Sequence, residues 1–542
     1  MIVIQAKLRR DSLVRTVTIV GVLSAIVAMG CSAAKHSRGA DRSATRILDG
    51  RTADTLGDRR ETVQWPDEAQ PEEAAELADD SDTESEPKPA LSISLGDALE
   101  LAFRSNRDYL REQENLFVTA LLLAGDRHTF SPQLSAALDF LYTDTEGQST
   151  SNSTNFSAGL SQRLRSGGTI SLDGQSAFST DLGTGTSSGN GFDSNLNVRL
   201  LQPLLRGAGY EASHAVLIQS ERSMIYAVRD FELFREDFSI DVARRYYDLA
   251  QQYQSIENER RNLEDLTFGE EQATALNAVG RVKELDVLRA RRNRLNAEDR
   301  LLEARESYEL ATERFRIFLG LPEDRAIDII KGAPDFVSVN YDVGSAIDVA
   351  LHNRLDFINR REQLEDVERE VRLSKNGLLP ELSFEASANI PTGPDSTFLD
   401  QRSTGNSATL GVSLALPVDR VSERIRYRRA QIGLAQAKRA FEQFRDELVV
   451  EIESSFRELE RRTLSLDIQR QLIEDEQKNV RVAQLRFERG ELPNRDVVEA
   501  QQSLLDARNS LIREQVNYEI ARLTLLRDLG IVFIDERGMW TE

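Results

Sequence analysis

The hydrophobic pattern of the chain changes its period several times, and these changes predict its elements. Apolar residues recur every three or four positions over 209–276 and 420–488, which is the spacing of one face of an α-helix. Shorter stretches with the same spacing, 94–129 and 343–377, precede the long ones. Each long stretch would form a helix of roughly 100 Å, and its narrow apolar seam is typical of coiled-coil packing in water.

Between the short and the long helical stretches, apolar and polar residues alternate, which predicts β-strands with one apolar face. Two further alternating segments flank Ser166-Gly167-Gly168 and predict a hairpin. The neighbouring segments 144–154 and 181–194 are rich in Ser, Thr, Gly and Asn, so we expect exposed loops there. The expected strands are Leu134–Tyr142, Leu196–Leu200, Leu382–Ile390 and Leu410–Leu416, with the hairpin at Phe156–Leu164 and Ile170–Phe178.

The helices and strands occur twice because the sequence is duplicated. Residues 95–102 match residues 343–350 at an offset of 248. From Phe231 onward the offset is 210 and stays constant. The difference of 38 residues places an insertion in the first copy, between Pro132 and Phe231. A duplication of this length predicts two structural repeats.

The alternating strands fit a transmembrane β-barrel with lipid outside and water inside. A barrel in lipid has to close, because an open edge leaves backbone groups without hydrogen bonds. One chain has too few strands to enclose a water-filled lumen, but three chains would supply about 12 to 18. The predicted fold is therefore mostly α-helical with a membrane β-barrel section, formed by a trimer of duplicated helix–strand–strand–helix chains. A soluble sandwich with a buried apolar face is the alternative.

The N-terminus carries the features of an export signal. Basic residues precede an apolar run from Val17 to Met29, which is shorter than a membrane-spanning helix needs. The only cysteine, Cys31, follows Val27-Ala28-Met29-Gly30, and this segment looks like a bacterial lipobox. We expect a signal peptide over 1–30 and acyl chains on Cys31 that hold the mature chain at a membrane. An uncleaved anchor helix, or an ordinary signal with an incidental cysteine, is the alternative.

The segment after the cysteine shows no apolar periodicity as far as Ala90, and residues 61–90 carry eleven acidic residues against one base, Lys88. Such a composition cannot bury enough apolar surface to offset its ordering entropy. We therefore expect 31–90 to be a lipidated N-terminus and an acidic flexible tether. The remaining expected parts are the first repeat over 91–322, the second repeat over 323–535 and a short C-terminal tail over 536–542.

The charge of the chain excludes one class of partner, and its composition argues against catalysis. Lys and Arg number 68 against 90 Asp and Glu, and the net charge of −22 repels nucleic-acid phosphates. A single cysteine excludes a disulfide framework, and the four histidines are not at metal-ligand spacing. No Ser/His/Asp set is evident, and the glycines around Gly183-Thr184-Gly185 are better explained as a loop than as a phosphate site. We expect no enzyme activity, no cofactor and no metal.

The lipobox, the duplicated halves and the paired turns of pattern G-x5-D-V-x2-A resemble the TolC-type outer-membrane efflux proteins, or outer membrane factor lipoproteins. The similarity covers roughly 91–535. It implies a homotrimeric outer-membrane β-barrel, anchored by lipid, that continues into a helical periplasmic tunnel. It also implies a periplasmic adaptor (membrane fusion protein) and an inner-membrane RND or ABC transporter as partners of a passive duct for efflux or type I secretion. A lipid-anchored, elongated coiled-coil periplasmic scaffold without a pore is the alternative. The sequence leaves open the cargo and whether the hairpin over 155–178 enters the barrel.

The resemblance also assigns roles to the turns that follow the two long helices. Asp496 and Glu499 match the acidic rings that narrow the periplasmic entrance in the family, and the first repeat has Asp286 and Arg289 at the equivalent positions. Carboxylates around a threefold axis would favour cations over anions. Asp286 and Asp496 are also expected as helix N-terminal residues stabilised by the macrodipole, and the two roles are compatible.

The glycines of the two turns, Gly280 and Gly490, are expected at left-handed helix ends, which is a structural role. One position departs from the family. Some members hold the entrance shut with a basic residue two places after the second glycine, where this chain has Leu492. Arg489 or Arg495 is a candidate to replace it.

Overall fold

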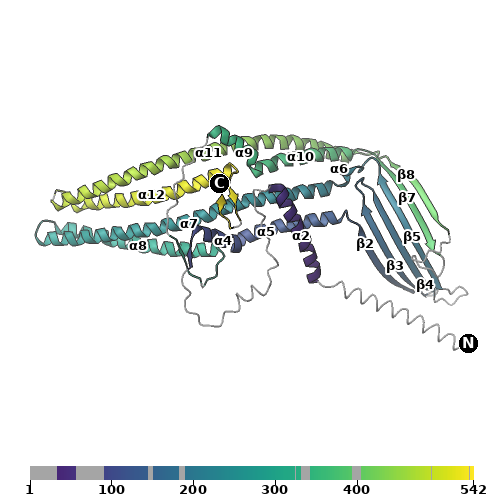
Figure 1. Ribbon diagram of the computed structural model, residues 1–542, viewed down its shortest axis with the longest axis horizontal. Coiled ribbons are helices and arrows are strands. Elements are labelled where there is room, and N and C mark those ends of the chain that lie inside the picture. The colour runs from purple at the N-terminus through teal and green to yellow at the C-terminus, as the bar shows by residue number, and fades with distance from the viewer. Residues whose placement is uncertain are drawn as a thin grey trace, which may run out of the picture.

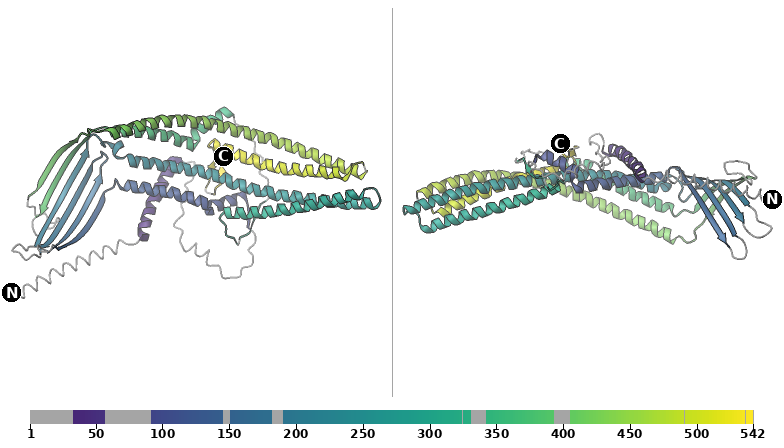
Figure 2. Two further views of the ribbon diagram at one scale, coloured as in Figure 1. Left: turned by 180° about the vertical axis from the view of Figure 1, so that it is seen from behind. Right: turned by 90° about the horizontal axis from the view of Figure 1, so that it is seen from below.

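The computed structural model of the chain is elongated, with a β-sheet at one end and two long helical hairpins that reach the other end (Figure 1). Seen from below, the helices and the sheet form a thin, curved wall (Figure 2). The structure describes residues 33–56, 91–144, 150–181, 190–323, 325–330, 342–392, 405–489, 491–535 and 537–541.

The helices follow the predicted duplication. The first repeat contains α4 (Leu95–Ser105), α5 (Arg107–His128), α6 (Tyr210–Ser213), α7 (Ala215–Ala278) and α8 (Glu284–Phe318). The second repeat contains α9 (Val343–Asn353), α10 (Leu355–Asn376), α11 (Val421–Glu488) and α12 (Asn494–Asp528). In each repeat the shorter helices lie end to end beside the long one, α5 and α8 along α7, and α10 and α12 along α11 (Figure 1). The narrow apolar seam predicted for the long helices is therefore covered along most of their length.

The sequence predicts continuous helices over 94–129 and 343–377, and this prediction is wrong at one residue in each. The backbone is extended at Asn106 (φ −68°, ψ 129°) and at Arg354 (φ −64°, ψ 120°). At the first break, Asn106 Oδ1 accepts hydrogen bonds from two backbone N–H groups in the first turn of α5. Because the apolar spacing continues on both sides, the pattern alone does not reveal the break.

The last helix of each repeat ends against the break in the first helix. Gly320 and Gly530 follow α8 and α12 with φ of 74° and 65°, a conformation that glycine adopts without strain. A Cβ on Gly320 would lie 2.1 Å from the carbonyl oxygen of Ser105, so the two backbones are in contact. A Cβ on Gly530 would lie 3.1 Å from the backbone nitrogen of Arg354. Asn106 strengthens the first contact, because its Nδ2 donates to the last carbonyl of α8 at 2.6 Å.

Six antiparallel strands form one open sheet in the order β2-β3-β4-β5-β7-β8. They are β2 (Gln133–Asp144), β3 (Thr150–Arg163), β4 (Thr169–Asp181), β5 (Asn190–Pro203), β7 (Glu381–Thr392) and β8 (Ser407–Ala415). The predicted hairpin forms β3 and β4 and is inserted between β2 and β5. The first repeat therefore contributes four strands and the second two, and one chain leaves β2 and β8 as open edges rather than closing a barrel.

The loops expected at 144–154 and 181–194 are shorter than predicted, because β3 already begins at Thr150 and β5 at Asn190. Ser, Thr and Asn in these segments continue the strands, since their backbones pair with neighbouring strands and their small side chains tolerate either face. Composition indicates a loop here, but strand pairing overrides it.

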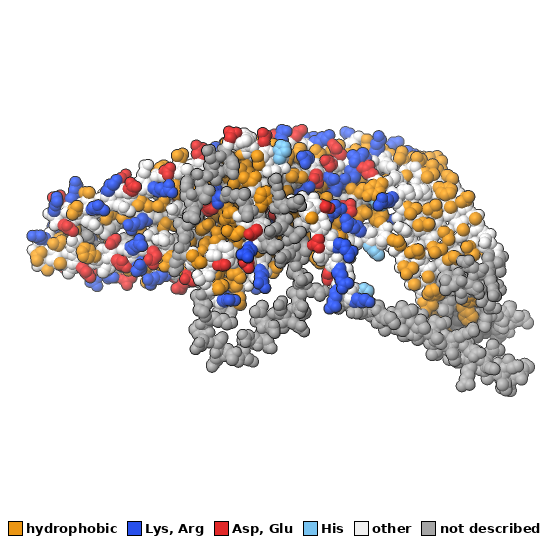
Figure 3. Space-filling view, in the orientation of Figure 1, with side chains coloured by type: hydrophobic (Ala, Val, Ile, Leu, Met, Phe, Trp, Pro, Cys, Tyr) orange, Lys and Arg blue, Asp and Glu red, His pale blue; other side chains and the backbone are white. Residues whose placement is uncertain are grey.

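The register of the sheet separates an apolar face from a polar one. One level of the apolar face consists of Leu134, Leu160, Leu172, Val198, Ala388 and Ala408. The next level, on the opposite face, consists of Ser135, Gly159, Asp173, Asn197, Asn389 and Ser407. Toward the end of the sheet that is farther from the helices, Phe140, Phe178 and Phe192 share one level of the apolar face. Hydrophobic side chains accordingly cover the sheet in the space-filling view (Figure 3).

Helix α2 (Ala33–Leu56) contradicts part of the predicted tether over 31–90. Its residues Ala44, Ile47 and Leu48 are buried against α5 and α7, at helical spacing. The sequence prediction missed α2 because only these few apolar residues mark it within a charged segment. Cys31 and residues 57–90 lie outside the described residues.

The C-terminal segment packs on the first repeat rather than forming a free tail. Within this segment, strands β9 (Phe533–Ile534) and β10 (Trp540–Thr541) pair with each other. Elsewhere, β1 (Leu91–Ile93) and β6 (Ile327–Ile329) form a separate short parallel pair. Arg235 on α7 is buried and donates to the carbonyl oxygens of Ile534 and Asp535 at 3.3 and 3.0 Å. Within the described residues, no helix has an apolar stretch long enough to cross a membrane.

Candidate functional site

The hairpin of the first repeat turns through a compact helix end. Gly280 has φ 73° and follows the C-cap residue of α7, Val279. Its N–H donates to the carbonyl of Asn277 at 2.9 Å, and the N–H of Arg281 donates to that of Leu276 at 2.9 Å. These two bonds form a Schellman motif, which satisfies the last carbonyls of the helix and favours glycine at this position.

The hairpin of the second repeat shows the equivalent outer bond. The N–H of Glu491 donates to the carbonyl of Arg486 at 2.9 Å, as that of Arg281 does in the first hairpin. Gly490, which the sequence assigns to the left-handed position, lies outside the described residues. Both turns lie at the end of the molecule that is farthest from the sheet (Figure 1).

Asp286 and Asp496 stand in the first turns of α8 and α12, where a carboxylate is stabilised by the helix dipole. Asp286 forms an ion pair with Arg289 one turn later, at 3.3 Å. Asp496 forms one with its neighbour Arg495, at 3.1 Å. The four predicted residues of the two tips are therefore brought together only partly, with Asp286 and Arg289 on one hairpin and Asp496 and Glu499 on the other.

Glu499 is exposed one turn after Asp496. Between them Val497 is buried, and together with the buried Ala500 it packs against Phe487 in a small core at the tip of the second hairpin. This core fixes the helix and leaves the Glu499 carboxylate in solvent. Of the two basic candidates for closing the entrance, Arg495 is already paired with Asp496, while Arg489 is exposed at the end of α11. Leu492 is half-buried.

The contacts that join the two hairpins were not predicted from the sequence. Asn258 on α7 donates to Asn509 on α12 at 2.8 Å. At the next residue of α7, burial raises the pKa of Glu259, and Arg300, whose Nε lies 3.8 Å from its carboxylate, opposes this shift. A signal for this seam exists in the sequence, because Asn258 and Asn262 interrupt the apolar spacing of the long helix. Polar residues at seam positions fix helix register.

Closer to the tips, a small cavity of about 120 Å³ separates the hairpins. Phe268 and Gln272 on α7 and Phe487 and Gln501 on the second hairpin line it. Asn494, at the start of α12, is buried beside it. The cavity shows that the two hairpins are not fully packed against each other near their tips.

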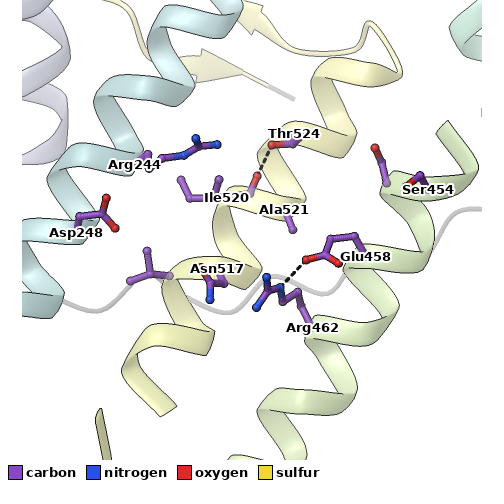
Figure 4. Close-up of a pocket in the computed structure, with 11 residues that line it drawn as sticks. Arg244, Asp248, Ser454, Glu458, Arg462, Asn517, Ile520, Ala521 and Thr524 are labelled. Carbon is purple, nitrogen blue, oxygen red and sulfur yellow. Dashed lines mark hydrogen bonds and ion pairs between the residues drawn. The ribbon is translucent and has the colours of Figure 1, made fainter. Parts of the chain in front are cut away.

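A larger cavity of about 520 Å³ lies between α7, α11 and α12, nearer the middle of the molecule (Figure 4). Arg462 on α11 reaches it and pairs with Glu458 and with Glu514, at 2.7 and 3.0 Å. On the α7 side, desolvation raises the pKa of Asp248, and Arg244 and Arg245 counter it. Its mixed charges can receive polar side chains of a partner, but its lining contains neither histidine nor cysteine.

The described residues offer no alternative centre for metal chemistry, since no group of three or more His, Cys, Asp or Glu side chains among them could hold a metal ion. The first hairpin carries Asp286 and its ion-pair partner Arg289 near its tip, and the second carries the carboxylates of Asp496 and Glu499. Such an arrangement can select ions by charge or receive another helical protein.

Comparison with known proteins identifies the architecture. Residues 346–530 match the family model described as outer membrane efflux protein, within the predicted second repeat. The outer membrane protein VceC of Vibrio cholerae has a similar structure, with TM-score 0.61 and 17% identity over 80% of this chain and 96% of that one. So does the CmeC outer membrane channel of Campylobacter jejuni, with TM-score 0.58 and 16% identity over 80% and 85%. No curated protein sequence matches the chain significantly.

The open state of the MtrE outer membrane channel of Neisseria gonorrhoeae gives the same result, with TM-score 0.57 and 12% identity over 82% of this chain and 90% of that one. At these identities the likeness concerns the fold. Together with the family match, it confirms the resemblance to outer-membrane efflux proteins that the sequence predicts, a family of transport conduits rather than enzymes.

Proposed function

We propose that three copies of this chain form an exit duct in the outer membrane, which passively conducts substrates delivered by an inner-membrane pump. The observation that carries this proposal is the two-faced, open sheet, with one face apolar across all six strands and the other polar. Its strands of 9 to 14 residues have the length that a tilted membrane strand requires. Such a sheet is suited to a wall between lipid and water.

Closure of this wall requires further copies. Six strands cannot enclose a water-filled lumen, and open edges are not tolerated in lipid. Because neighbouring strands alternate in direction, β8 of one copy runs antiparallel to β2 of the next and can extend the sheet. Three copies would then give a barrel of about 18 strands, and the level of Phe140, Phe178 and Phe192 would form part of its aromatic girdle.

The helical part also has an uncovered surface that suits neighbouring copies. Leu288, Leu295 and Leu302 on α8 recur every seven residues and are 57%, 47% and 59% exposed. Ile317 near the end of the same helix is 65% exposed. A heptad stripe of this kind is the usual coiled-coil seam, and a second copy in the same ring is the occupant that also closes the sheet.

In the assembled duct, Asp496 and Glu499 of three copies would bring six carboxylates to the periplasmic entrance. The helical tips would receive a periplasmic adaptor, the membrane fusion protein, which links the duct to an RND or ABC transporter. Acyl chains on Cys31 would anchor each copy in the outer membrane. No cofactor takes part, and the energy for transport comes from the pump.

The first test is conductance. Purified protein in planar lipid bilayers should form discrete ion channels and should run as a heat-sensitive trimer on gels. A single-chain particle that gives no current in bilayers would reject the duct and would favour the lipid-anchored coiled-coil scaffold instead.

The entrance is tested in the same bilayers. Replacing Asp496 and Glu499 by Asn and Gln removes six negative charges from the proposed ring and should lower the cation-to-anion permeability ratio several-fold. The matched control is Asp286→Asn with Arg289→Gln, which leaves the net charge of the first hairpin unchanged. Equal selectivity in both double variants would remove the ring from the proposal.

A further inference from the structure

Helix α2 arranges its cations along one face. Lys35, Arg38, Arg42 and Arg46 are all exposed and follow one another at spacings of three and four residues. Side chains at this spacing lie above one another on a helix. Residues 35–46 contain one carboxylate, Asp41, although the whole chain carries a net charge of −22. We call these four residues the basic stripe.

The basic stripe faces away from the protein. Ala44, Leu48 and Thr52 on the same helix are buried, with exposed fractions of 0%, 0% and 3%. At 100° per residue, the centre of this buried face lies about 125° around the helix from the centre of the stripe. The buried face packs on α5 and α7, and the four side chains of the stripe are exposed on the outside of the helical body.

The position of α2 indicates which kind of partner the basic stripe can reach. Glu221, in the second turn of α7, holds the helix by accepting Arg51 at 3.4 Å and Arg127 at 3.1 Å. Arg127 is six residues before β2, so α2 is fixed at the root of the sheet. Figure 1 shows α2 crossing the long helices steeply at this place, and Figure 3 shows its blue side chains projecting below the body.

We propose that the basic stripe of α2 binds the phosphate-bearing headgroups of anionic lipids in the membrane leaflet next to the helical body. The inference rests on the proposed function, because it requires the sheet to span that membrane. A helix at the root of the sheet and steep to the long axis of the molecule runs close to the plane of the leaflet. Arginine is suited to phosphate, since its planar guanidinium donates in pairs to phosphate oxygens.

The chemistry favours lipid over an acidic protein as the occupant. A leaflet offers a continuous row of phosphates that matches a row of cations in any register, whereas a protein partner requires a specific pattern of carboxylates. Each Lys or Arg near an anionic surface strengthens the association by roughly five-fold, and screening by salt weakens it. The stripe would also supply the second signal that stable anchoring by a short acylated segment needs.

The test measures which lipids surround the full-length protein in vesicles. The protein is reconstituted in phosphatidylcholine vesicles that contain a trace of spin-labelled phosphatidylglycerol or spin-labelled phosphatidylcholine. Electron paramagnetic resonance gives the fraction of each label that the protein immobilises, and their ratio is the preference for the anionic lipid. The test variant is K35Q/R38Q/R42Q/R46Q. The control, R281Q/R291Q/R292Q/R305Q, removes four exposed charges from the turn of the first hairpin and from α8.

We expect wild-type protein and the control variant to prefer phosphatidylglycerol several-fold, with a loss of preference at high salt. The stripe variant should bring the ratio close to one while its thermal stability stays unchanged. A stripe variant that keeps the wild-type ratio would overturn the proposal, as would a preference lost equally in the control. Conductance of the same vesicle preparations separates the two proposals, because a failed duct abolishes current in wild-type protein whatever the lipid ratio is.

Discussion

The two repeats of the chain share a backbone but differ in what covers them. In both, a first helix breaks, a last helix ends in a left-handed glycine against that break, and a long helix turns back after about 64 to 68 residues. The first repeat is covered by α2 and by the C-terminal segment, whereas α11 of the second repeat keeps apolar side chains such as Val450 and Ile468 about 60% exposed. Backbone geometry requires the shared features, whereas the differences depend on which elements pack on each repeat.

The difference extends to single equivalent residues. Arg235 is 3% exposed under the C-terminal segment, while its counterpart Arg445 is exposed and pairs with its neighbour Asp446 at 3.1 Å. Glu259 is buried beside Arg300, while its counterpart Gln469 is uncharged. A duplicated fold thus tolerates opposite choices at one position, provided that the surroundings differ.

The largest effect is expected from making the two repeats equal in the sheet. Replacing residues 145–189 by Asn-Gly removes β3 and β4 and leaves β2 next to β5, which run antiparallel like β7 and β8. In the proposed trimer the barrel would fall from about 18 to about 12 strands. Since barrel diameter grows roughly linearly with strand number, the bore should shrink by about one third.

The measurement is the largest polyethylene glycol that enters the channel from the side of the sheet and reduces its conductance. The helical circular dichroism signal serves as the control, because the deletion should leave the helices intact. An unchanged size limit, with folded trimers, would show that the hairpin does not belong to the wall of the bore.

The next effect concerns the buried arginine. Arg235→Met leaves the carboxylate of Glu232, which is fully buried, without its guanidinium partner at 2.9 Å and removes the donor to two carbonyls of the C-terminal segment. Breaking a buried pair in this way costs about 3–5 kcal/mol. Arg445→Met should cost at most about 0.5 kcal/mol, because that side chain is exposed. Thermal unfolding at a fixed scan rate in detergent compares them, and similar losses would contradict the assigned burial.

The sequence predicted those parts of the fold that depend on periodicity. The long helices, the six alternating segments and the duplication are readable from one chain, because burial of one face forces a repeat of 3.6 or 2 residues. The helix breaks were not predictable in this way. Asn106 stops one helix and starts the next through its own side chain, which leaves no gap in the apolar spacing.

The sequence predicted the backbone positions of the candidate site but not the partners of its side chains. The equivalence of Asp286 and Asp496 at helix starts follows from the paired turns, and the structure places both in first turns. The partners of these residues did not follow, since Arg289 and Arg495 reach the two acids from opposite sides along the sequence. The contact between Asn258 and Asn509 joins residues 251 positions apart, and the polar interruption at Asn258 indicates a seam without indicating its partner.

The glycines at the ends of α8 and α12 give a smaller effect that still separates the repeats. Gly320→Ala places a side chain on a residue with φ 74°, which strains the backbone, and its Cβ would lie 2.1 Å from the carbonyl oxygen of Ser105. The helix end must therefore move, and we expect the free energy of unfolding to fall by about 3 kcal/mol or more. Gly530→Ala meets its nearest atoms at 3.1 Å and should lose about 1–2 kcal/mol. Gly280→Ala, with nothing within 4 Å, measures the strain of the backbone alone. Equal unfolding midpoints for the first two would show that both junctions relax.

The smallest expected effect is a pH dependence of stability. It should move from the first repeat to the second when the equivalent residues Glu259 and Gln469 are exchanged. Burial raises the pKa of Glu259 above its ordinary value of 4.5, and Asp506 adds to this while Arg300 opposes it. The folded state therefore binds the proton more tightly than the unfolded state, so this contribution to stability is fully present below the unfolded pKa and is lost as pH rises through the folded pKa. Glu259→Gln should remove this dependence and should change stability at pH 7 by less than about 1 kcal/mol.

The reciprocal variant places a carboxylate where the second repeat has none. The Oε1 of Gln469 is buried and accepts no hydrogen bond from the described residues, and the position equivalent to Arg300 is Ser510. Gln469→Glu should therefore destabilise the protein at pH 7, and the loss should be relieved as the pH is lowered toward 5, because no cation offsets the desolvation of the new carboxylate. Unfolding midpoints of both variants at pH 7 and pH 5 test the exchange. A Gln469→Glu variant with the midpoint of wild-type protein at both pH values would show that position 469 is open to water. The two repeats would then differ in burial more than their shared backbone indicates.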